Sequence, residues 1–336
     1  MANKLYTEDQ RGRIQGLAKN LIINGDFNLW QRGTSFVSAA SSAYTTDRFI
    51  TYKSGSMVYD ITRSTDVPTT EQSGHKSNFS YKLAVTTGDA SIAAGDFTMV
   101  RQKIEGYNIA QVMGRTLVLS FWVKATVTGT YCIGFSNSIA DRSFIREYTI
   151  DTTNTWEKKY VTITMTETGG SWDYTSGIGL NINWIMACGS TYHTTADAWQ
   201  TGTYLSTSNQ VNGVGSASDI FELSQIQFEV GETPTEFEYR PLEEEVSLCQ
   251  RYYQVITIAA GGYFAAAMSL IGQSDYIVAM RGTPTTVEVN GAYYGNVNCG
   301  TTSSIIKNSI GIVAYRATLG AGFAQFSSVI RCDTEL

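Results

Sequence analysis

Proline, histidine and charged residues are all scarce in this chain of 336 residues. It contains 4 prolines and 2 histidines, and 16% of its residues are charged. The net charge of -6 at pH 7 gives no basic surface of the kind that neutralises phosphate backbones, so we expect no nucleic-acid partner. Thr, Tyr, Ser, Gly and Val fill much of the chain instead, which is typical of half-buried strands and glycine-bearing turns. We therefore predict an all-β protein that is long enough for two domains.

Long apolar segments are also missing. No stretch approaches the roughly 18 uninterrupted apolar residues that can span a bilayer. The start of the chain lacks the apolar segment of a signal peptide. We expect no membrane insertion, and a protein that is made and kept in a cytosol.

The cysteines are odd in number and widely spaced: Cys132, Cys188, Cys249, Cys299 and Cys332. None belongs to a Cys-x-x-Cys pair, so a zinc site has no support in the sequence. Because cysteine is among the most buried residue types, we expect these side chains to be small apolar parts of the core.

No catalytic residues are predicted. His75 and His193 lie in polar, turn-like stretches, which indicates surface histidines and not bases that activate a nucleophile. Glycoside hydrolysis needs two opposed carboxylates, and nothing in the sequence selects such a pair. The glycine-rich residues 213–216 and 320–322 lack the Gly-Lys-Ser/Thr of a phosphate-binding loop, so we expect turns there. The sequence therefore predicts a protein that is not an enzyme.

Apolar and polar residues alternate in several stretches. The alternating apolar residues are Tyr81, Leu83 and Val85; Leu117, Leu119, Phe121 and Val123; Val161, Ile163 and Met165; and Leu180, Ile182, Trp184 and Met186. This period of two predicts antiparallel strands with one face on a core and one face in water. Their recurrence at short intervals, with turn residues between them, favours a sandwich or a barrel.

One predicted strand changes phase along its length. Phe221 and Leu223 have odd numbers, whereas Ile226 and Phe228 have even numbers. One inserted residue near Ser224 would return all four side chains to the same face, so we predict a β-bulge there.

The chain changes character after Arg240. Pro241 suits the first turn of a helix, and the three glutamates at residues 243–245 favour its positive end. One face of this helix would carry Leu242, Val246, Cys249 and Tyr253, which predicts a linker of roughly three turns. Strand-like segments then resume at residues 254–260, 276–280, 285–290, 309–317 and 325–332. Residues 241–336 are therefore predicted to form a helix linker and a second, smaller β module.

Eight short blocks follow one another in a characteristic order. They stand at residues 20–27 (NLIINGDF), 30–33 (WQRG), 47–49 (DRF), 121–124 (FWVK), 155–157 (TWE), 227–231 (QFEVG), 235–240 (TEFEYR) and 248–253 (LCQRYY). The ordered set resembles a family of tailed-bacteriophage virion proteins. These are tail-fibre or receptor-binding subunits built on a jelly roll like that of carbohydrate-binding modules.

The resemblance implies both a fold and a function. The fold is a jelly-roll β-sandwich over residues 20–240, followed by a short helix and a second, smaller β-sandwich module. The function is that of a structural virion protein, a fibre or receptor-binding subunit that contacts the host cell surface and binds a receptor, expected to be a glycan. Such a protein is made in the host cytoplasm and is located in the virion as a tail or capsid appendage.

Two kinds of protein partner are expected. The charged residues 1–19, which have capping-box spacing at residues 7–10, would form a short helix or arm that attaches the subunit to other virion proteins. In a free-standing protein this arm would be a frayed terminus. The resemblance to phage fibres also implies a homotrimer.

The composition of the second module independently indicates a homo-oligomer. From residue 256 to residue 330 the charged residues are Asp275, Arg281, Glu288, Lys307 and Arg316. A module this small has a large surface for its volume, which a soluble monomer would cover with more charges. We expect an interface between like subunits to cover part of this surface, although the first domain could also cover some of it.

Residues 169–215 combine aromatic side chains with polar ones in glycine-containing stretches. A glycan offers weakly apolar ring faces and hydroxyl groups, which this combination suits. The candidate ligand-binding residues are Trp172, Tyr174, Tyr192, Trp199 and Tyr204. The alternative is that these aromatic rings pack under long loops or at a subunit interface.

Asn24 and Asp26 are the candidate metal ligands. In the jelly rolls of carbohydrate-binding modules, the turn after the first strand often helps to hold a structural calcium ion, which prefers oxygen ligands. This chain has Asn28 where a glutamate is common in such modules. A tight Asx-type turn is therefore the alternative, and no other cofactor is expected.

Other functions stay open at this stage. One is a head-decorating fibre of the capsid, and another is a glycan-depolymerising tail spike. Spikes of that kind commonly use long repetitive β-helices, and no short repeat occurs in this chain. A third is a carbohydrate-binding accessory module of a secreted bacterial protein, which would normally carry a signal peptide or a catalytic partner.

Overall fold

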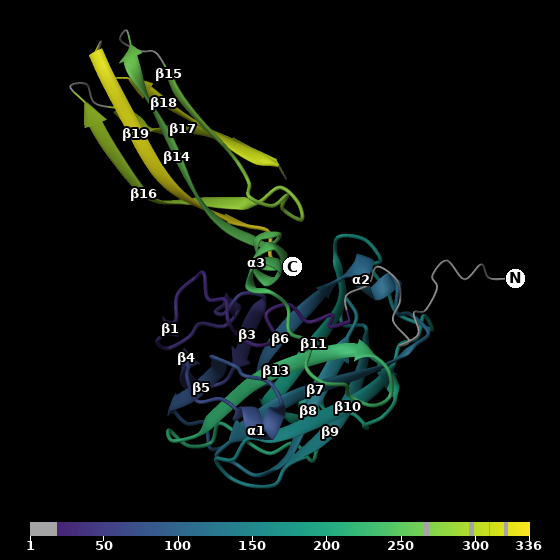
Figure 1. Cartoon of the computed structure of the whole chain (residues 1–336). Coiled ribbons are helices and arrows are strands. Elements are labelled where there is room, and N and C mark those ends of the chain that lie inside the picture. Colours follow the sequence, from purple (N-terminus) through teal and green to yellow (C-terminus); the bar gives the residue numbers. More distant parts are fainter. Residues whose placement is uncertain (1–18, 265–268, 296–298, 309, 319–321) are drawn as a thin grey trace, which may run out of the picture. The chain divides into compact units, whose positions relative to one another are not determined.

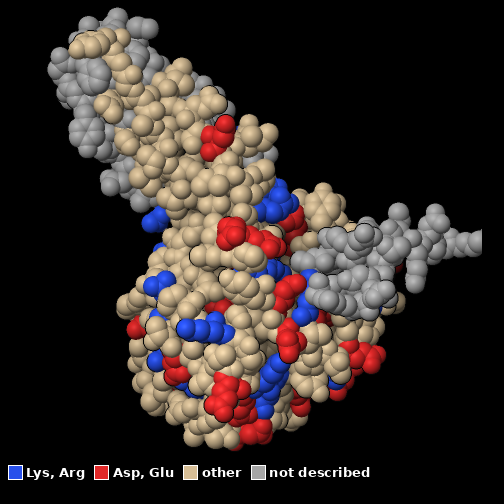
Figure 2. Space-filling model, viewed as in Figure 1, with Lys and Arg blue, Asp and Glu red and all other residues tan. Residues whose placement is uncertain are grey.

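The computed structural model describes residues 19–264, 269–295, 299–308, 310–318 and 322–336. The chain divides into two compact units, Met1–Arg240 and Pro241–Leu336 (Figure 1). Charged side chains are spread over the visible face of the first unit and are few on the described part of the second (Figure 2). Residues 1–18, most of the predicted attachment arm, lie outside the described residues.

The N-terminal unit is a sandwich of two antiparallel sheets. The six-stranded sheet has the order β1 (Ser35–Phe36), β4 (Val58–Ser64), β5 (Ser80–Thr87), β13 (Ile220–Val230), β7 (Thr116–Ala125) and β10 (Glu157–Thr164). The seven-stranded sheet has the order β12 (Trp199–Thr201), β9 (Arg142–Ile150), β8 (Gly129–Ser136), β11 (Ile178–Cys188), β6 (Phe97–Glu105), β3 (Phe49–Ser54) and β2 (Ala43–Tyr44). The chain crosses between the sheets repeatedly, for example from β3 to β4, from β5 to β6 and from β6 to β7. These crossings produce the predicted jelly-roll sandwich.

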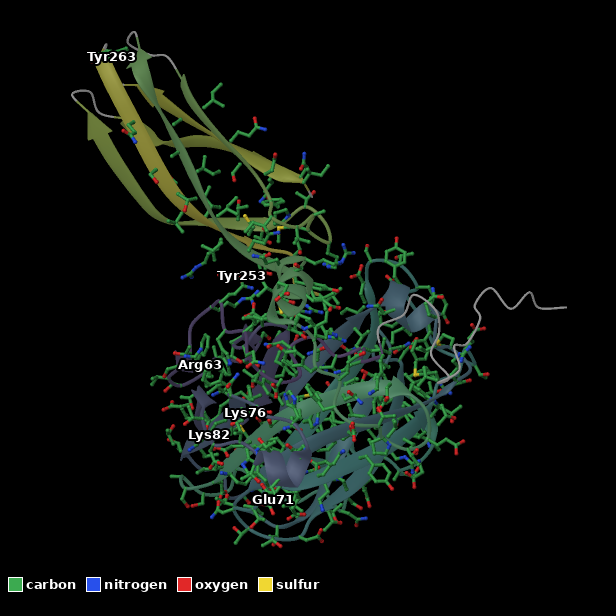
Figure 3. The ribbon with its side chains drawn as sticks, in the orientation of Figure 1. Arg63, Glu71, Lys76, Lys82, Tyr253 and Tyr263 are labelled. Atoms are coloured by element: carbon green, nitrogen blue, oxygen red, sulfur yellow. The ribbon has the colours of Figure 1, made fainter. Side chains whose placement is uncertain are left out.

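Short helical turns lie in the connections between strands. The connection between β4 and β5 contains α1 (Thr70–Ser73), and its Glu71 and the nearby Lys76 are exposed (Figure 3). Helix α2 (Gly106–Ala110) follows β6, and a 3-10 turn, Ser190–Tyr192, follows β11. Among the described residues, no helix is long and apolar enough to cross a membrane.

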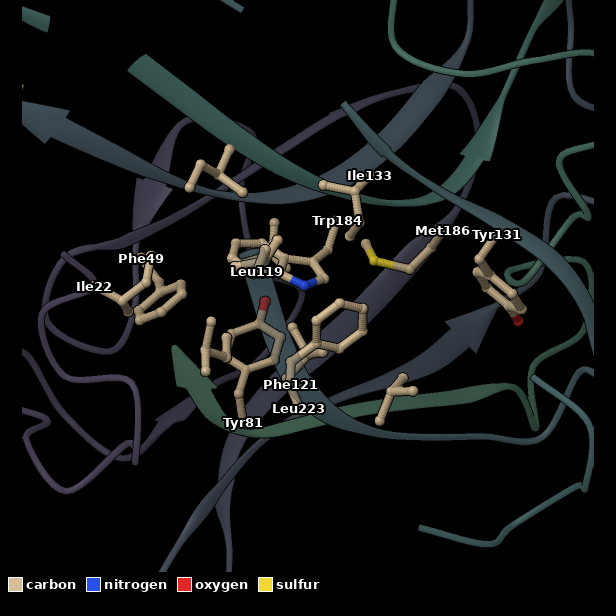
Figure 4. Close-up of a cluster of buried hydrophobic side chains, with 14 of the residues drawn as sticks. Ile22, Phe49, Tyr81, Leu119, Phe121, Tyr131, Ile133, Trp184, Met186 and Leu223 are labelled. Atoms are coloured by element: carbon tan, nitrogen blue, oxygen red, sulfur yellow. The ribbon is translucent and has the colours of Figure 1, made fainter. Parts of the chain in front are cut away.

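The main hydrophobic core lies between the two sheets (Figure 4). All the apolar residues of the predicted alternating stretches are buried there, which confirms the period-two prediction for this face. Trp184 lies near the middle, with its ring centroid 6.1 Å from that of Phe121 and 6.2 Å from that of Phe49. Burial of each such side chain contributes roughly 1.5–3 kcal/mol to stability.

The seven-stranded sheet is also buried on part of its outer face, where the sequence predicted exposure to water. An outer cluster there consists of Met99, Cys132, Ile145, Ile185, Cys188 and Leu205. The cover comes from residues 190–212, which return over the sheet. The N–H of Val211 donates to the carbonyl of Thr130 at 2.9 Å, and the N–H of Asp197 donates to that of Ile145 at 2.9 Å. The prediction that one face of β11 contacts water was therefore wrong, because residues 190–212 cover that face.

The predicted burial of cysteine is confirmed for the four cysteines whose side chains are described. Cys132, Cys188, Cys249 and Cys332 are free and buried. The side chain of Cys299 lies outside the described ones.

The predicted bulge in β13 is confirmed. The pairing register with β7 shifts between Ser224 and Gln227, and Gln225 has a φ of 48°. Phe221, Leu223, Ile226 and Phe228 consequently all lie in the main core. One extra residue thus keeps both halves of this long strand on the same core.

The C-terminal unit starts with the predicted helix, α3 (Leu242–Gln250), directly after Pro241. Cys249 and Tyr253 are buried as expected, whereas Leu242 is 53% exposed. Leu242 is the first helical residue and stands a full two turns before Cys249. The apolar face therefore starts later than predicted.

Two three-stranded antiparallel sheets complete the C-terminal unit, as predicted for a smaller β module. One has the order β14 (Tyr253–Phe264), β19 (Gly322–Asp333) and β16 (Thr285–Gly295), and the other β15 (Ser269–Asp275), β18 (Gly311–Thr318) and β17 (Cys299–Lys307). Strands β15 and β17 had no counterpart in the predicted set.

Residues 276–280, which were predicted to form a strand, are a loop. The side chain of Gln254 holds this loop, since it accepts a hydrogen bond from the N–H of Ile277 at 3.0 Å and donates one to the carbonyl of Val278 at 2.5 Å. Tyr276 and Met280 are buried. Their burial explains why this segment has the apolar residues of a strand although it forms none.

Candidate functional site

The predicted aromatic residues separate into two groups. Trp172 and Trp199 lie together, with ring centroids 5.5 Å apart and ring planes at 79°. Trp199 also contacts Phe144, at 5.5 Å between centroids, and both tryptophans pack against the main core. Each indole N–H is already used, since Trp172 donates to the carbonyl of Gly169 at 3.1 Å and Trp199 donates to that of Thr164 at 2.9 Å. The pair is half-buried and extends the core at the edge strand β12.

Tyr174 lies in the same loop as Trp172 and is half-buried. Burial, and then the negative charge of Glu167, raise the pKa of its hydroxyl. The structure gives Tyr174 no ring contact with the tryptophan pair among the described residues.

Tyr192 and Tyr204 belong to the second group, on the outer face of the seven-stranded sheet. Both are half-buried and pack against the outer cluster, as do Tyr52 and Phe97. The rings of Phe97 and Tyr192 meet edge to face at 5.3 Å. The sequence pattern did not single out Tyr52 and Phe97, because they precede the predicted stretch by more than seventy residues in the chain.

Polar side chains continue this face beside the tyrosines. Asn183 on β11 stands opposite Arg101 on β6, and Tyr52 on β3 stands opposite Met99 of the same β6. The Arg101 Nε donates to the Asn183 Oδ1 at 2.5 Å, and the Arg101 guanidinium carbon lies 4.8 Å from the centroid of the Tyr52 ring. The Asn183 Nδ2 in turn donates to the carbonyl of Gly134 at 2.8 Å. We name Tyr52, Arg101, Asn183, Tyr192 and Tyr204 the outer-face site.

The backbone of the covering segment approaches the sheet closely beside this site. A Cβ atom added to Gly134 would lie 3.0 Å from the carbonyl oxygen of Leu205. Gly134 therefore lets residues 204–206 lie flat on the sheet, which brings Tyr204 and Tyr192 onto the same face.

The outer-face site has the chemistry that sugars require. Its tyrosine rings are half-exposed apolar plates, and its guanidinium and amide supply hydrogen bonds. Burial lowers the pKa of Arg101, an effect that the nearby Tyr52 and Tyr44 oppose. The guanidinium nevertheless remains charged, because arginine is not deprotonated in proteins.

Asn24 and Asp26 are arranged as parts of a turn. The Asn24 Oδ1 accepts from the N–H of Leu29 at 3.0 Å, and its Nδ2 donates to the carbonyl of Leu29 at 2.9 Å. Asp26 accepts from the Ser77 Oγ at 2.5 Å and from the Asn28 Nδ2 at 3.2 Å. Hydrogen-bond donors, which would repel a cation, thus face the Asp26 carboxylate, and no group of three or more acidic, histidine or cysteine side chains that could hold a metal occurs among the described residues. The Asn24 bonds hold residues 24–29 in a turn, although the Oδ1 bonds the residue five positions on and not the one two positions on that defines an Asx turn. The donors around Asp26 do not fit a calcium site.

His75 also contacts Asp26, with 3.0 Å between the His75 Nε2 and the Asp26 Oδ2. Its side chain is only 16% exposed, whereas the sequence predicted a histidine on the surface. Ser77, Asp26 and His75 do not form a catalytic triad, because the aspartate stands between the serine and the histidine. His75 therefore cannot take a proton from Ser77 in this arrangement.

Three of the sequence blocks meet where the N-terminal unit ends. The backbone N–H of Asn20 donates to the Glu238 Oε2 at 2.8 Å, and the N–H of Glu238 donates to the Gln227 Oε1 at 2.7 Å. The Arg240 guanidinium donates to the carbonyl of Ile22 at 2.8 Å and also to that of Asn20. These blocks consequently join the first residues, the bulged strand β13 and the last residues of the unit.

Comparison with known proteins gives no family by sequence, since no protein-family model and no curated protein sequence matches the chain. Solved structures with a similar fold include the enzymatically active domain of tailspike protein 4 of bacteriophage CBA120 (TM-score 0.34, 16% identity). That match covers 63% of this chain and 22% of the tailspike chain. TmCBM61 in complex with β-1,4-galactotriose has a TM-score of 0.33 and 9% identity, over 64% of this chain and 100% of that one. The family 11 carbohydrate-binding module from Clostridium thermocellum, in complex with a mixed-linked tetrasaccharide, has a TM-score of 0.32 and 10% identity, over 60% and 98%. Similarity of this degree concerns the fold alone.

Proposed function

We propose that this protein is a non-enzymatic structural protein of a tailed-phage virion, a fibre or receptor-binding subunit that binds a host surface glycan. The observation that carries the binding part is the outer-face site. There, Tyr52, Arg101 and Asn183 come from three neighbouring strands, and Tyr52 packs against the same outer cluster as two further tyrosines. Half-exposed rings next to fixed hydrogen-bonding groups are the combination that sugar faces and hydroxyl groups require.

The rigidity of the site supports a binding role. Asn183 is fully buried and tied to Gly134, and it fixes the Arg101 guanidinium against the Tyr52 ring. A ligand would therefore meet groups that are already ordered, which lowers the entropic cost of binding.

The virion part of the proposal rests on the ordered sequence blocks and on the C-terminal unit. The blocks are the ones that resemble tailed-phage fibre proteins, and three of them form the hydrogen-bonded end of the N-terminal unit. The proposal includes a homotrimer, attachment through residues 1–19 and a location in the virion.

A panel of bacterial capsular and O-antigen polysaccharides, immobilised and probed with the full-length protein, tests glycan binding. Replacement of Tyr52 by alanine should weaken binding roughly 10-fold, as is usual for a central aromatic contact. Tyr160→Ala is the matched control, because Tyr160 is 56% exposed and lies on β10 of the other sheet. Equal loss in both variants, or no binding of the unaltered protein to any polysaccharide, would overturn the proposal.

A further inference from the structure

Arg101 is a partly buried cation without a carboxylate partner. Its Nε is bonded to Asn183, its guanidinium lies over Tyr52, and its Nη2 lies 3.9 Å from the sulfur of Met99. Among the described residues, no Asp or Glu forms an ion pair with it, and the charges that act on its pKa are those of Tyr52 and Tyr44.

Three other partly buried arginines of this unit are paired with carboxylates. Arg32 lies 3.7 Å from Asp47, Arg146 lies 2.6 Å from Asp197, and Arg240 lies 3.7 Å from Glu238. Removal of a guanidinium from water is costly unless a counter-charge or a full set of acceptors replaces the water. Arg101 differs from these three arginines because no carboxylate among the described residues pairs with it. An external anion would supply this missing counter-charge.

The surroundings of Arg101 leave its outer end available. Asn183 accepts from the Nε, the Nη2 lies near the Met99 sulfur, and the guanidinium also makes a side-chain hydrogen bond with Tyr52, so its donors are only partly used inside the protein. Arg101 is half-buried, so part of its side chain reaches solvent. A planar fork of this kind binds carboxylate and phosphate groups through two parallel hydrogen bonds.

Lys103 adds a second positive charge to the same face. It follows Arg101 by two residues on β6, so both side chains point to the outer side, and its Nζ lies 6.0 Å from the centroid of the Tyr52 ring. Glu105, two residues further along, adds one negative charge at the end of the strand. This face of β6 thus carries two positive charges and one negative charge, although the whole chain carries a net charge of -6.

We infer that the outer-face site, as the glycan-binding face proposed above, is specific for an anionic glycan, and that Arg101 binds the carboxylate or phosphate group of its acidic sugar. Tyr52 and Asn183 act as positioning residues that hold the guanidinium plane. The inference rests on the proposed glycan binding but goes further, because neutral and acidic sugars present the same ring faces and differ in this one group.

The test uses the same polysaccharide panel, divided into neutral members, members with uronic acids and members whose acidic group is a phosphate. The full-length protein should bind acidic members, and its affinity should fall as the salt concentration rises. Chemical reduction of the uronic carboxylates should abolish binding if carboxylate is the recognised group. Binding that survives this reduction on the phosphate-bearing members would assign the phosphate.

Arg101→Gln should lower affinity for the acidic members by roughly 10-fold or more, the usual effect of the loss of a charge-assisted hydrogen bond. Arg101→Lys keeps the charge but not the fork, and should bind with intermediate affinity. Arg146→Gln is the matched control, because this arginine already has Asp197. Thermal unfolding of each variant identifies any loss of affinity that comes from misfolding.

The outcomes separate the two proposals. Binding to neutral members that Arg101→Gln leaves unchanged would overturn the anionic specificity and leave the glycan-binding proposal intact. An absence of binding to every member would overturn both. Equal losses of affinity in Arg101→Gln and Arg146→Gln would show that binding depends only on the overall charge of the protein. A specific role for Arg101 would then be rejected.

Discussion

The side chain of Asn20 is hydrogen-bonded to the bulged strand β13, more than two hundred residues later in the chain. Its Nδ2 donates to the carbonyl of Ile226 at 3.1 Å, and its Oδ1 accepts from the N–H of Phe228 at 3.0 Å. Asn20 is 3% exposed, so these backbone groups have no access to bulk water. The amide thus supplies hydrogen bonds that the bulge removes from the sheet.

Asn20→Ala should therefore destabilise the N-terminal unit by about 2–4 kcal/mol, because it leaves a buried N–H and a buried carbonyl unpaired. Asn20→Asp keeps the acceptor oxygen but places a second carboxylate oxygen against the buried carbonyl of Ile226, so a loss at least as large is expected at neutral pH. Urea denaturation of the full chain measures both. A loss below about 0.5 kcal/mol for the alanine variant would contradict this role.

Trp172 and Trp199 should behave mainly as packing residues. Each single replacement by alanine is expected to lower the unfolding temperature, and a double-mutant cycle should give a coupling energy of about 0.5–1.5 kcal/mol for the ring pair. The prediction from the sequence, that these rings bind the receptor, implies nearly unchanged stability and weaker adsorption to cells. Thermal unfolding and cell adsorption of the same three variants distinguish the two.

The ion pairs around Lys124 predict a dependence of stability on pH. Lys124 lies 2.7 Å from Glu222 and also contacts Asp66, which accepts a hydrogen bond from the Trp156 Nε1 at 2.8 Å. Burial raises the pKa of Glu222, although Lys124 opposes this effect. Burial alone would also raise the pKa of Asp66, but hydrogen bonds from Lys124 and Trp156 lower it.

A raised pKa means that folded Glu222 binds its proton more tightly than unfolded Glu222, so its contribution to stability is lost as the pH rises through the folded pKa. The unaltered protein should therefore gain stability relative to Glu222→Gln as the pH falls from 7 towards about 4.3, the usual glutamate pKa. Asp66 contributes in the opposite sense, and its contribution is lost only in stronger acid. Denaturation midpoints of both proteins at several pH values test this. Parallel curves would show that Glu222 is not responsible.

The C-terminal unit should carry much of the self-association. Apolar side chains are exposed there, including Tyr263 (84%; labelled in Figure 3), Ile277 (71%) and Ile310 (66%). Light scattering is expected to give an oligomer, a trimer in our proposal, for the full chain and a smaller species for a chain that ends at Arg240. A monomeric full chain at micromolar concentration, or a truncated chain that stays fully oligomeric, would contradict the prediction.

The sequence predicted those features that depend on local alternation. The strands of the main core and the bulge near Ser224 were correct, because side chains alternate strictly across a strand and a change of phase requires an extra residue. The loop at residues 276–280 was predicted wrongly because the buried Tyr276 and Met280 give a strand-like pattern, although the hydrogen bonds come from the side chain of Gln254.

The outer-face site could not be predicted in the same way. Outward-facing residues such as Tyr52 and Arg101 look alike on either sheet, and only the pairing of β3, β6 and β11 brings them next to Asn183. Tyr192 and Tyr204 were identified by composition, but their position depends on where residues 190–212 return over the sheet. Neither pairing order nor the path of a long connection is encoded in local spacing.

The hydrogen bonds of Arg240 also have a mechanical consequence. The chain leaves the N-terminal unit immediately after this residue, whose guanidinium is bonded to the carbonyls of Asn20 and Ile22. A tensile load applied through Pro241 therefore reaches the first residues of the unit directly, before it can peel β13 away from its neighbours. These bonds therefore join the first and last residues of the unit, and β13 should resist being pulled from the sheet strand end first.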